Sequence, residues 1–236
     1  MPYYSGNSII MSPSASLRTE KDLLGTLEVS ADAYYGIQTL RAVQNFNLSG
    51  VPLSHFPRLV IGLAMVKQAA ADANRALGHL PAAKHTAIST ACARIIQGEF
   101  HEQFVVDMIQ GGAGTSTNMN ANEVIANIAL EAMGHAKGEY QYLHPNNDVN
   151  MAQSTNDAYP TAIRVGLLLG HQALLGSLDQ LIQSFAAKGL EFGHVLKMGR
   201  TQLQDAVPMT LGQEFRAFAT TLGEDLQHLI RLAPLL

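Results

Sequence analysis

The chain has 236 residues, of which 47% are hydrophobic and 14% are charged, so it can build one large domain or two modest ones. A net charge of −4 and an isoelectric point near 6.1, with no block of Lys or Arg, argue against a nucleic-acid or anionic-membrane surface. No apolar run approaches the roughly 18 residues of a membrane span. The single cysteine, Cys92, cannot form an internal disulfide. We therefore expect a soluble, cytoplasmic protein with no membrane or nucleic-acid partner.

The first part of the chain predicts several helices behind a tail. Residues 1–19 are rich in Ser, Tyr, Pro and Gly, which predicts a disordered N-terminal tail. Residues 20–50 carry turn-forming glycines and predict short irregular and helical pieces. Apolar spacing then predicts helices over 57–77, with Pro57 in the first turn, over 82–96, and from Thr117 to Gly134. Together these elements predict an N-terminal domain over residues 20–152.

The helical pattern lapses over residues 137–153 in favour of Gly, Pro and Asn, and we place the domain boundary there. A long helix is predicted over 156–189, a break over 199–208, and a last helix from Thr210 towards Leu236. These two amphipathic helices cannot enclose an apolar core by themselves, so they need partners from later in the chain or from other subunits. The predicted fold is all-α, with a mostly helical N-terminal domain followed by the first long helices of a central helical bundle over 153–236.

Three polar breaks interrupt the predicted helices, at residues 111–122, 150–157 and 199–204. The first combines Gly111, Gly112 and Gly114 with hydroxyl and amide side chains that can accept from the free N–H groups of a new helix. Such a loop can bind an anion, although a glycine-bent turn before a capped helix explains it as well. The second is either a helix N-cap or another anion site, and the third is either a plain loop or part of the same site. Three neutral breaks rich in hydroxyl and amide groups favour a site for a small dicarboxylate.

The sequence contains none of the motifs of several other common catalytic and binding sites. The glycine run lacks the lysine of a P-loop, and no dinucleotide-binding, zinc-protease or nucleophile-elbow motif occurs. The nine histidines are scattered, and we expect them to be surface or locally bonded residues, with no metal site. Cys92 falls in the apolar spacing of its helix, which predicts a buried side chain.

Four segments carry a family resemblance: YYGIQTLR at 34–41, GGAGTSTNMNANE at 111–123, QSTND at 153–157 and KMGRTQLQDAVPMTLGQE at 197–214. They resemble the aspartase/fumarase superfamily, and within it the bacterial aspartate ammonia-lyases, from about residue 19 to the end. The resemblance implies that six residues bind the carboxylates and amino group of the substrate: Thr115, Ser154, Thr155, Asn156, Thr201 and Gln202. By the resemblance, fumarases and some aspartases have His at the position of Gln202, whereas a group of bacterial aspartases has Gln, and fumarases have Ser at the position of Thr155. These two residues favour an aspartase over a fumarate hydratase, which stays the alternative.

The resemblance implies reversible elimination of ammonia from L-aspartate to give fumarate. A base removes a proton next to the side-chain carboxylate, and fixed hydrogen-bond donors stabilise the negative charge that develops there. Holding both carboxylates orients the C–H and C–N bonds for elimination. Such a reaction needs no redox or group-carrying cofactor, and we expect none.

The sequence departs from the family because it stops at about half the usual length. The family's Gly-Ser-Ser loop supplies the serine base and a carboxylate-binding lysine, and it lies beyond residue 236. Family members are homotetramers in which each active site collects three regions from three subunits. We expect this chain to supply two of these regions, no catalytic base, and little activity by itself. A third hypothesis is a non-catalytic assembly module that pairs with longer subunits.

Overall fold

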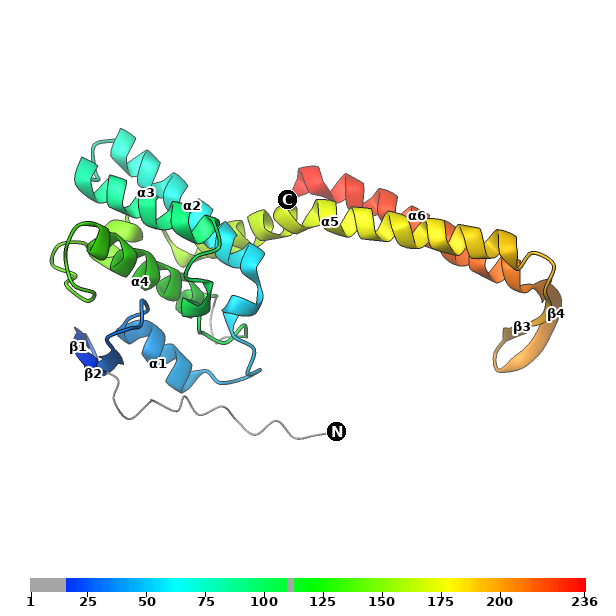
Figure 1. The fold of residues 1–236 in the computed structure, drawn as a ribbon, viewed down its shortest axis with the longest axis horizontal. Helices are drawn as coiled ribbons and strands as arrows, with labels where there is room; N and C mark the ends of the chain where they lie inside the picture. Colours follow the sequence, from blue (N-terminus) through cyan, green and yellow to red (C-terminus); the bar gives the residue numbers. More distant parts are fainter. Residues whose placement is uncertain (1–15, 110–112) are drawn as a thin grey trace. The chain divides into compact units, whose positions relative to one another are not determined.

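A computed structural model of the chain describes residues 16–109 and 113–236. Contacts divide the chain into two units, Met1–Gly166 and Leu167–Leu236. The boundary falls inside a long helix, α5 (Thr155–Glu191; Figure 1), and the predicted domain boundary lies just before the start of that helix. Residues 1–15 of the predicted tail, with Gly111 and Gly112, lie outside the described residues. Within the described residues, no helix is long and apolar enough to cross a membrane.

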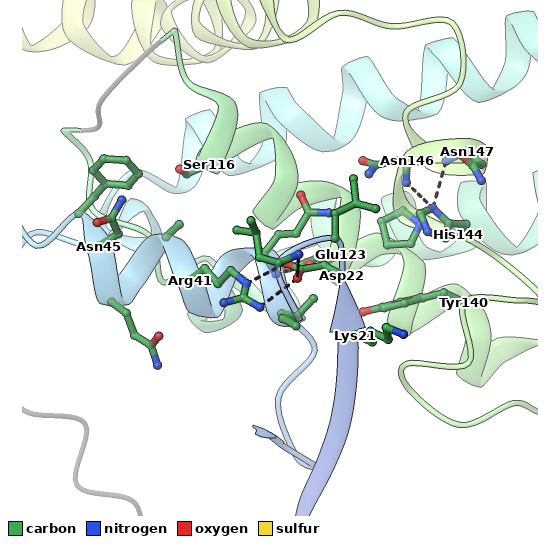
Figure 2. A pocket seen from close by; sticks show the side chains of 18 residues that line it. Lys21, Asp22, Arg41, Asn45, Ser116, Glu123, Tyr140, His144, Asn146 and Asn147 are labelled. Atoms are coloured by element: carbon green, nitrogen blue, oxygen red, sulfur yellow. Dashed lines mark hydrogen bonds and ion pairs between the residues drawn. The ribbon is translucent and has the colours of Figure 1, made fainter. Parts of the chain in front are cut away.

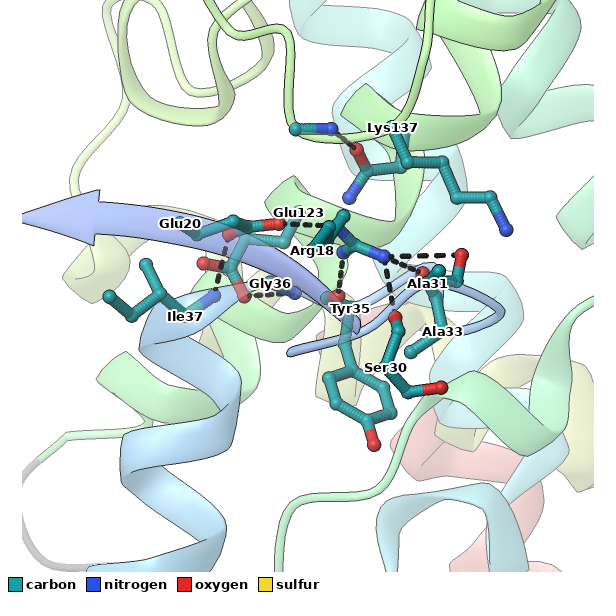
Figure 3. Close-up of polar contacts among 12 residues, drawn as sticks. Arg18, Glu20, Ser30, Ala31, Ala33, Tyr35, Gly36, Ile37, Glu123 and Lys137 are labelled. Atoms are coloured by element: carbon teal, nitrogen blue, oxygen red, sulfur yellow. Dashed lines mark hydrogen bonds and ion pairs between the residues drawn. The ribbon is translucent and has the colours of Figure 1, made fainter. Parts of the chain in front are cut away.

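A β-hairpin opens the described part of the first unit, where the sequence predicted a tail up to residue 19 and irregular pieces after it. Strand β1 (Leu17–Asp22) pairs antiparallel with β2 (Gly25–Ser30). The Arg18 guanidinium explains why the chain is ordered here, because it crosses from β1 to the segment after β2. It donates to the carbonyl oxygens of Ser30, Ala33 and Tyr35 at 2.8, 2.7 and 2.7 Å, and pairs with Glu20 at 2.8 Å (Figure 3).

Two buried carboxylates hold the N-terminus of the next helix, α1 (Ile37–Asn45). Its N-cap residue is Gly36, which has no side chain to satisfy the free N–H groups of the first turn. Glu123 accepts from the backbone N–H groups of Gly36, Gln38 and Thr39 at 2.9, 2.9 and 3.0 Å. Glu20 accepts from the N–H group of Ile37 at 2.8 Å. Negative charge at a helix N-terminus is also favoured by the helix dipole.

Three helices form the core of the first unit, and their predicted positions are confirmed. They are α2 (Pro57–Ala76), α3 (Ala82–Ile96) and α4 (Thr115–Ala132), which lie side by side in Figure 1. Leu63, Ile88 and Ile125 are fully buried where the helices meet. Cys92 is buried as predicted, and burial raises the pKa of its thiol to about 12. Short helical turns lie between α1 and α2 (η1, Leu53–His55), between α3 and α4 (η2, His101–Gln103) and after α4 (η3, Pro145–Val149).

Helix α4 is buried on nearly all sides, and its polar side chains hold the surrounding loops. Asn120 donates to the carbonyl oxygen of Gln103 at 3.0 Å. Asn127 donates to the carbonyl oxygen of Tyr34 at 2.7 Å and accepts from the N–H group of Gly138 at 2.8 Å. Because buried amides must find partners, these asparagines fix the loops around the helix.

The second unit consists of the rest of α5, a hairpin and α6 (Leu211–Leu232), followed by η4 (Ala233–Leu235). The two long helices run antiparallel, since the Phe185 and Phe215 rings lie 5.8 Å apart and His171 Nε2 lies 2.9 Å from the carbonyl oxygen of Leu229. The predicted break over 199–208 does interrupt the two long helices, but it is a hairpin and not a plain loop, because strands β3 (Leu196–Thr201) and β4 (Gln204–Thr210) pair there. The prediction of a mostly helical chain is confirmed, with two small hairpins added to it.

Candidate functional site

The first polar break leads directly into α4. The helix begins at Thr115 rather than near Thr117, and Gly114, with a φ of 83°, occupies the N-cap instead of a hydroxyl residue. A Cβ atom at position 114 would overlap the ring of Tyr159, which explains the glycine. Thr115 is exposed in the first turn, whereas Asn118 is buried.

The second polar break leads into α5 in the same way. The Ser154 hydroxyl accepts from the backbone N–H group of Asn156 at 3.2 Å, so this side chain caps the helix. Thr155 is half-buried, and Asn156 is exposed. The Asn156 side chain makes no hydrogen bond with any residue that the structure describes.

The structure joins these two breaks. Asn118 Nδ2 donates to Thr155 Oγ1 and to Asn150 Oδ1, both at 3.0 Å. The ring of Tyr159 packs on Gly114, one residue before α4 begins. Thr115 thus lies on the helix that is bonded to the segment carrying Ser154, Thr155 and Asn156.

The third break lies in the second unit, at the tip of the β3–β4 hairpin. Thr201 ends β3, and Gln202 and Leu203 form the two-residue turn. Both turn residues have positive φ, 49° and 62°, as a two-residue hairpin turn requires. Thr201 and Gln202 are exposed.

A buried lysine that the sequence analysis did not single out contacts the second polar break. Lys67 of α2 is fully buried, and its Nζ atom lies 2.8 Å from Asn150 Oδ1 and 2.9 Å from Gln153 Oε1. Desolvation lowers the pKa of Lys67 to about 7. The spacing of the sequence contained a signal, since Lys67 follows Leu63 by four residues and precedes Ala71 by four, and both neighbours are buried.

A cavity of about 1120 Å³ lies elsewhere in the first unit (Figure 2). It is bounded by the β1–β2 turn, α1, the start of α4 and residues 140–147, and none of the six predicted substrate-binding residues lines it. Arg41 pairs there with Asp22 at 2.8 and 2.9 Å. His144 Nδ1 accepts from the backbone N–H groups of Asn146 and Asn147 at 3.0 and 3.3 Å, and burial lowers the pKa of this histidine. His144 is thus locally bonded, as predicted. Across the described residues, no cluster of His, Cys, Asp or Glu is arranged to hold a metal ion.

Comparison with known proteins gives a consistent result. A family model described as "Lyase" matches residues 25–236. The chain is 85% identical over 224 residues to the aspartate ammonia-lyase of Pseudomonas aeruginosa, which covers 95% of this chain and 47% of that protein. It is 55% identical over 224 residues to the aspartate ammonia-lyase of Escherichia coli K12, covering 94% of this chain and 47% of that protein. The chain therefore spans about half the length of the curated relatives it matches.

Solved structures agree with the sequence matches. A Brucella melitensis protein described as fumarate lyase:delta crystallin has 61% identity and a TM-score of 0.85, covering 92% of this chain and 49% of that one. A class II fumarase from Schistosoma mansoni has 37% identity and a TM-score of 0.80, covering 93% of this chain and 46% of that one. The chain belongs to the lyase family, and its sequence matches aspartate ammonia-lyases over about half of their length.

Proposed function

We propose that this chain provides two of the three substrate-binding regions of an aspartate ammonia-lyase, which reversibly eliminates ammonia from L-aspartate to give fumarate. The observation that carries this proposal is the 85% identity to the Pseudomonas aeruginosa enzyme. The bond between Asn118 and Thr155 supports it, because it ties two of the family's motifs together.

In this proposal the starts of α4 and α5 bind the substrate. Thr115 and Asn156 are exposed and lie in the first turns of these helices, where backbone N–H groups and the helix dipole favour an anion. Ser154 and Thr155 add hydroxyl groups. Together these four residues hold a carboxylate and the amino group of L-aspartate, and no cofactor or metal is needed.

In the assembled enzyme, the third polar break also contributes residues to a substrate-binding site. Thr201 and Gln202 stand exposed at the tip of a hairpin, where they are available to a site on another subunit. The charge that develops on the carboxylate during deprotonation is stabilised by such fixed donors. By the family resemblance, the serine base and a lysine come from a segment that these 236 residues do not contain.

We also propose a cytoplasmic homotetramer. Leu174, Leu181, Phe218 and Ile230 are exposed on α5 and α6, and such a run of apolar side chains favours burial against other helices. The alternatives are a fumarate hydratase, favoured by the 37% identity to the Schistosoma mansoni fumarase, and a non-catalytic assembly module.

The test uses a completed chain, defined as this chain followed by the C-terminal half of the Pseudomonas aeruginosa enzyme. Fumarate formation is followed by its ultraviolet absorbance with L-aspartate and with L-malate. The proposal predicts faster turnover of L-aspartate. Faster turnover of L-malate would identify a hydratase instead. A folded completed chain that produces fumarate from neither substrate would support the assembly module.

A further inference from the structure

We propose that Lys67 is a positioning residue which, through Asn150 and Asn118, leaves the Thr155 hydroxyl proton free to donate to the substrate carboxylate. The inference rests on the proposed function, because it assigns a partner to Thr155. All four residues lie in the first unit and form one continuous series of hydrogen bonds.

The series begins with a group that can only donate to its two neighbours. Lys67 Nζ contacts two amide oxygens, Asn150 Oδ1 at 2.8 Å and Gln153 Oε1 at 2.9 Å. An ammonium group has three N–H donors and no acceptor, and the neutral amine still has two N–H groups for these two oxygens. Lys67 therefore fixes the Asn150 amide with its oxygen inward. The Asn150 nitrogen then donates to the carbonyl oxygen of Gln153 at 3.0 Å.

The orientation of Asn150 determines that of the next amides. Asn150 Oδ1 also receives Asn118 Nδ2 at 3.0 Å and Asn122 Nδ2 at 3.3 Å. If the side-chain amide of Asn118 or Asn122 were rotated by 180°, its oxygen atom would face Asn150 Oδ1. The oxygen atoms of Asn118 and Asn122 are buried without a hydrogen-bond partner among the described residues. Their orientation is thus imposed by Asn150, since their own oxygens gain nothing from it.

The last step gives the direction of the Thr155 proton. The second N–H of Asn118 Nδ2 donates to Thr155 Oγ1 at 3.0 Å. A hydroxyl group has one proton, so a Thr155 oxygen that accepts from Asn118 keeps its own proton for another partner. A carboxylate only accepts, so it needs that proton. With a reversed Asn118 amide, Thr155 would donate to Asn118 and turn a lone pair towards the carboxylate.

A purely structural role gives a poor account of a lysine at this position. Moving an amine into a fully buried site carries a desolvation cost, which lowers the pKa of Lys67 to about 7. An unbranched apolar side chain of similar length fills the same space without this cost. Lys67 supplies a hydrogen-bond donor directed at Asn150, and an apolar side chain does not.

The test compares two buried side chains of α2 that both donate to the same segment. Lys67→Met removes the donor of the series. Asn74→Leu is the matched control, because Asn74 is buried and donates to the carbonyl oxygen of Met151 at 3.0 Å, outside the series. In the completed chain, Lys67→Met is expected to lower kcat/KM for L-aspartate by roughly 10- to 100-fold, the range for one misdirected hydrogen bond, and Asn74→Leu by less than about 3-fold.

A double-mutant cycle with Thr155→Val asks whether Lys67 acts through the hydroxyl. In the Thr155→Val background, Lys67→Met is expected to lower kcat/KM no further, because the group it orients is already gone. Equal losses in both backgrounds would overturn the proposal. Equal losses from Lys67→Met and Asn74→Leu would also overturn it.

A second pair of variants covers the case in which Lys67→Met does not fold. Towards Lys67 and Asn118, Asn150 acts only as an acceptor. Asn150→Asp keeps this acceptor and loses the bond from the Asn150 nitrogen to the carbonyl oxygen of Gln153, whereas Asn150→Leu removes both. The expected order of kcat/KM is wild type, then Asn150→Asp, then Asn150→Leu. Asn150→Asp falling as low as Asn150→Leu would contradict the series.

A nuclear magnetic resonance measurement tests the series without any activity. The side-chain amide protons of Asn118 are expected to exchange slowly with water in the wild type and in Asn74→Leu, and at least 10-fold faster in Lys67→Met, since the orienting bond is lost. Unchanged exchange in Lys67→Met would overturn the proposal. If the completed wild-type chain makes no fumarate, the proposed function fails, while this measurement still decides the role of Lys67.

Discussion

Asn118 Nδ2 lies 3.0 Å from Thr155 Oγ1, and this hydrogen bond joins the first turn of α4 to the first turn of α5. The two residues are 37 positions apart in the chain. The bond places two helix N-termini together, each with exposed polar side chains from a family motif. The candidate site is therefore a joint feature of two segments.

Asn118→Ala should destabilise the first unit. It removes the two N–H groups that donate to Thr155 and Asn150 and leaves the oxygens of these half-buried residues with fewer partners, which costs about 1–3 kcal/mol. The free energy of unfolding, measured with urea, is expected to fall by this amount. Asn146→Ala is the control, because Asn146 is exposed, and its effect should stay within about 0.5 kcal/mol. Equal effects of the two variants would contradict the role of Asn118.

Gly114→Ala should destabilise the chain more than Gly134→Ala does. Both glycines have positive φ, 83° and 81°, so both variants carry the same backbone strain. Only at position 114 would the added Cβ atom overlap another residue, Tyr159, whereas position 134 has nothing within 4 Å. The additional loss from overpacking is about 1–3 kcal/mol. Adding Tyr159→Ala to Gly114→Ala should remove much of that difference, and strictly additive effects would contradict the contact.

Lys67 should make stability depend on pH above neutrality. Desolvation lowers its folded-state pKa to about 7, well below the value of 10.5 for a free lysine. Between these two values the unfolded chain binds more protons than the folded chain, so the free energy of unfolding rises with pH. This gain in stability is lost as pH falls through 7. From pH 7 to 9, the wild type should gain roughly 1.4 kcal/mol per pH unit relative to Lys67→Met. A difference that stays constant with pH would show that the Lys67 pKa is not lowered.

Leu203→Gly should stabilise the β3–β4 hairpin. Leu203 has a φ of 62° and is almost fully exposed, so glycine relieves strain and loses no packing. The expected gain is about 1 kcal/mol, measured as the free energy of unfolding. Ala206→Gly, at an exposed position of β4, should lower stability instead. A loss of stability in Leu203→Gly would mean that the leucine side chain has a packing partner.

Sequence patterns predicted the helices well and the tertiary contacts poorly. Pro57 and the glycines after α2 and α3 determine local backbone geometry, so the bounds of these helices were readable. The β3–β4 hairpin was missed because Gln202 and Leu203 lack the Asn-Gly signal of a two-residue turn. The burial of Lys67 was missed because its partner Asn150 is distant in the chain, and a charged side chain is expected outside. The six substrate-binding residues stay a prediction.

Replacing Asn156 by alanine tests the candidate site most directly. Its side chain is exposed and makes no hydrogen bond within the described part of the chain, so its loss should leave folding unchanged. If Asn156 binds the substrate, kcat/KM for L-aspartate in the completed chain should fall about 100-fold or more, as for one lost oxyanion-type donor. Thr161→Ala, at an exposed position of α5, should have no effect. Wild-type kcat/KM in Asn156→Ala would contradict the assignment of the α5 N-terminus to substrate binding.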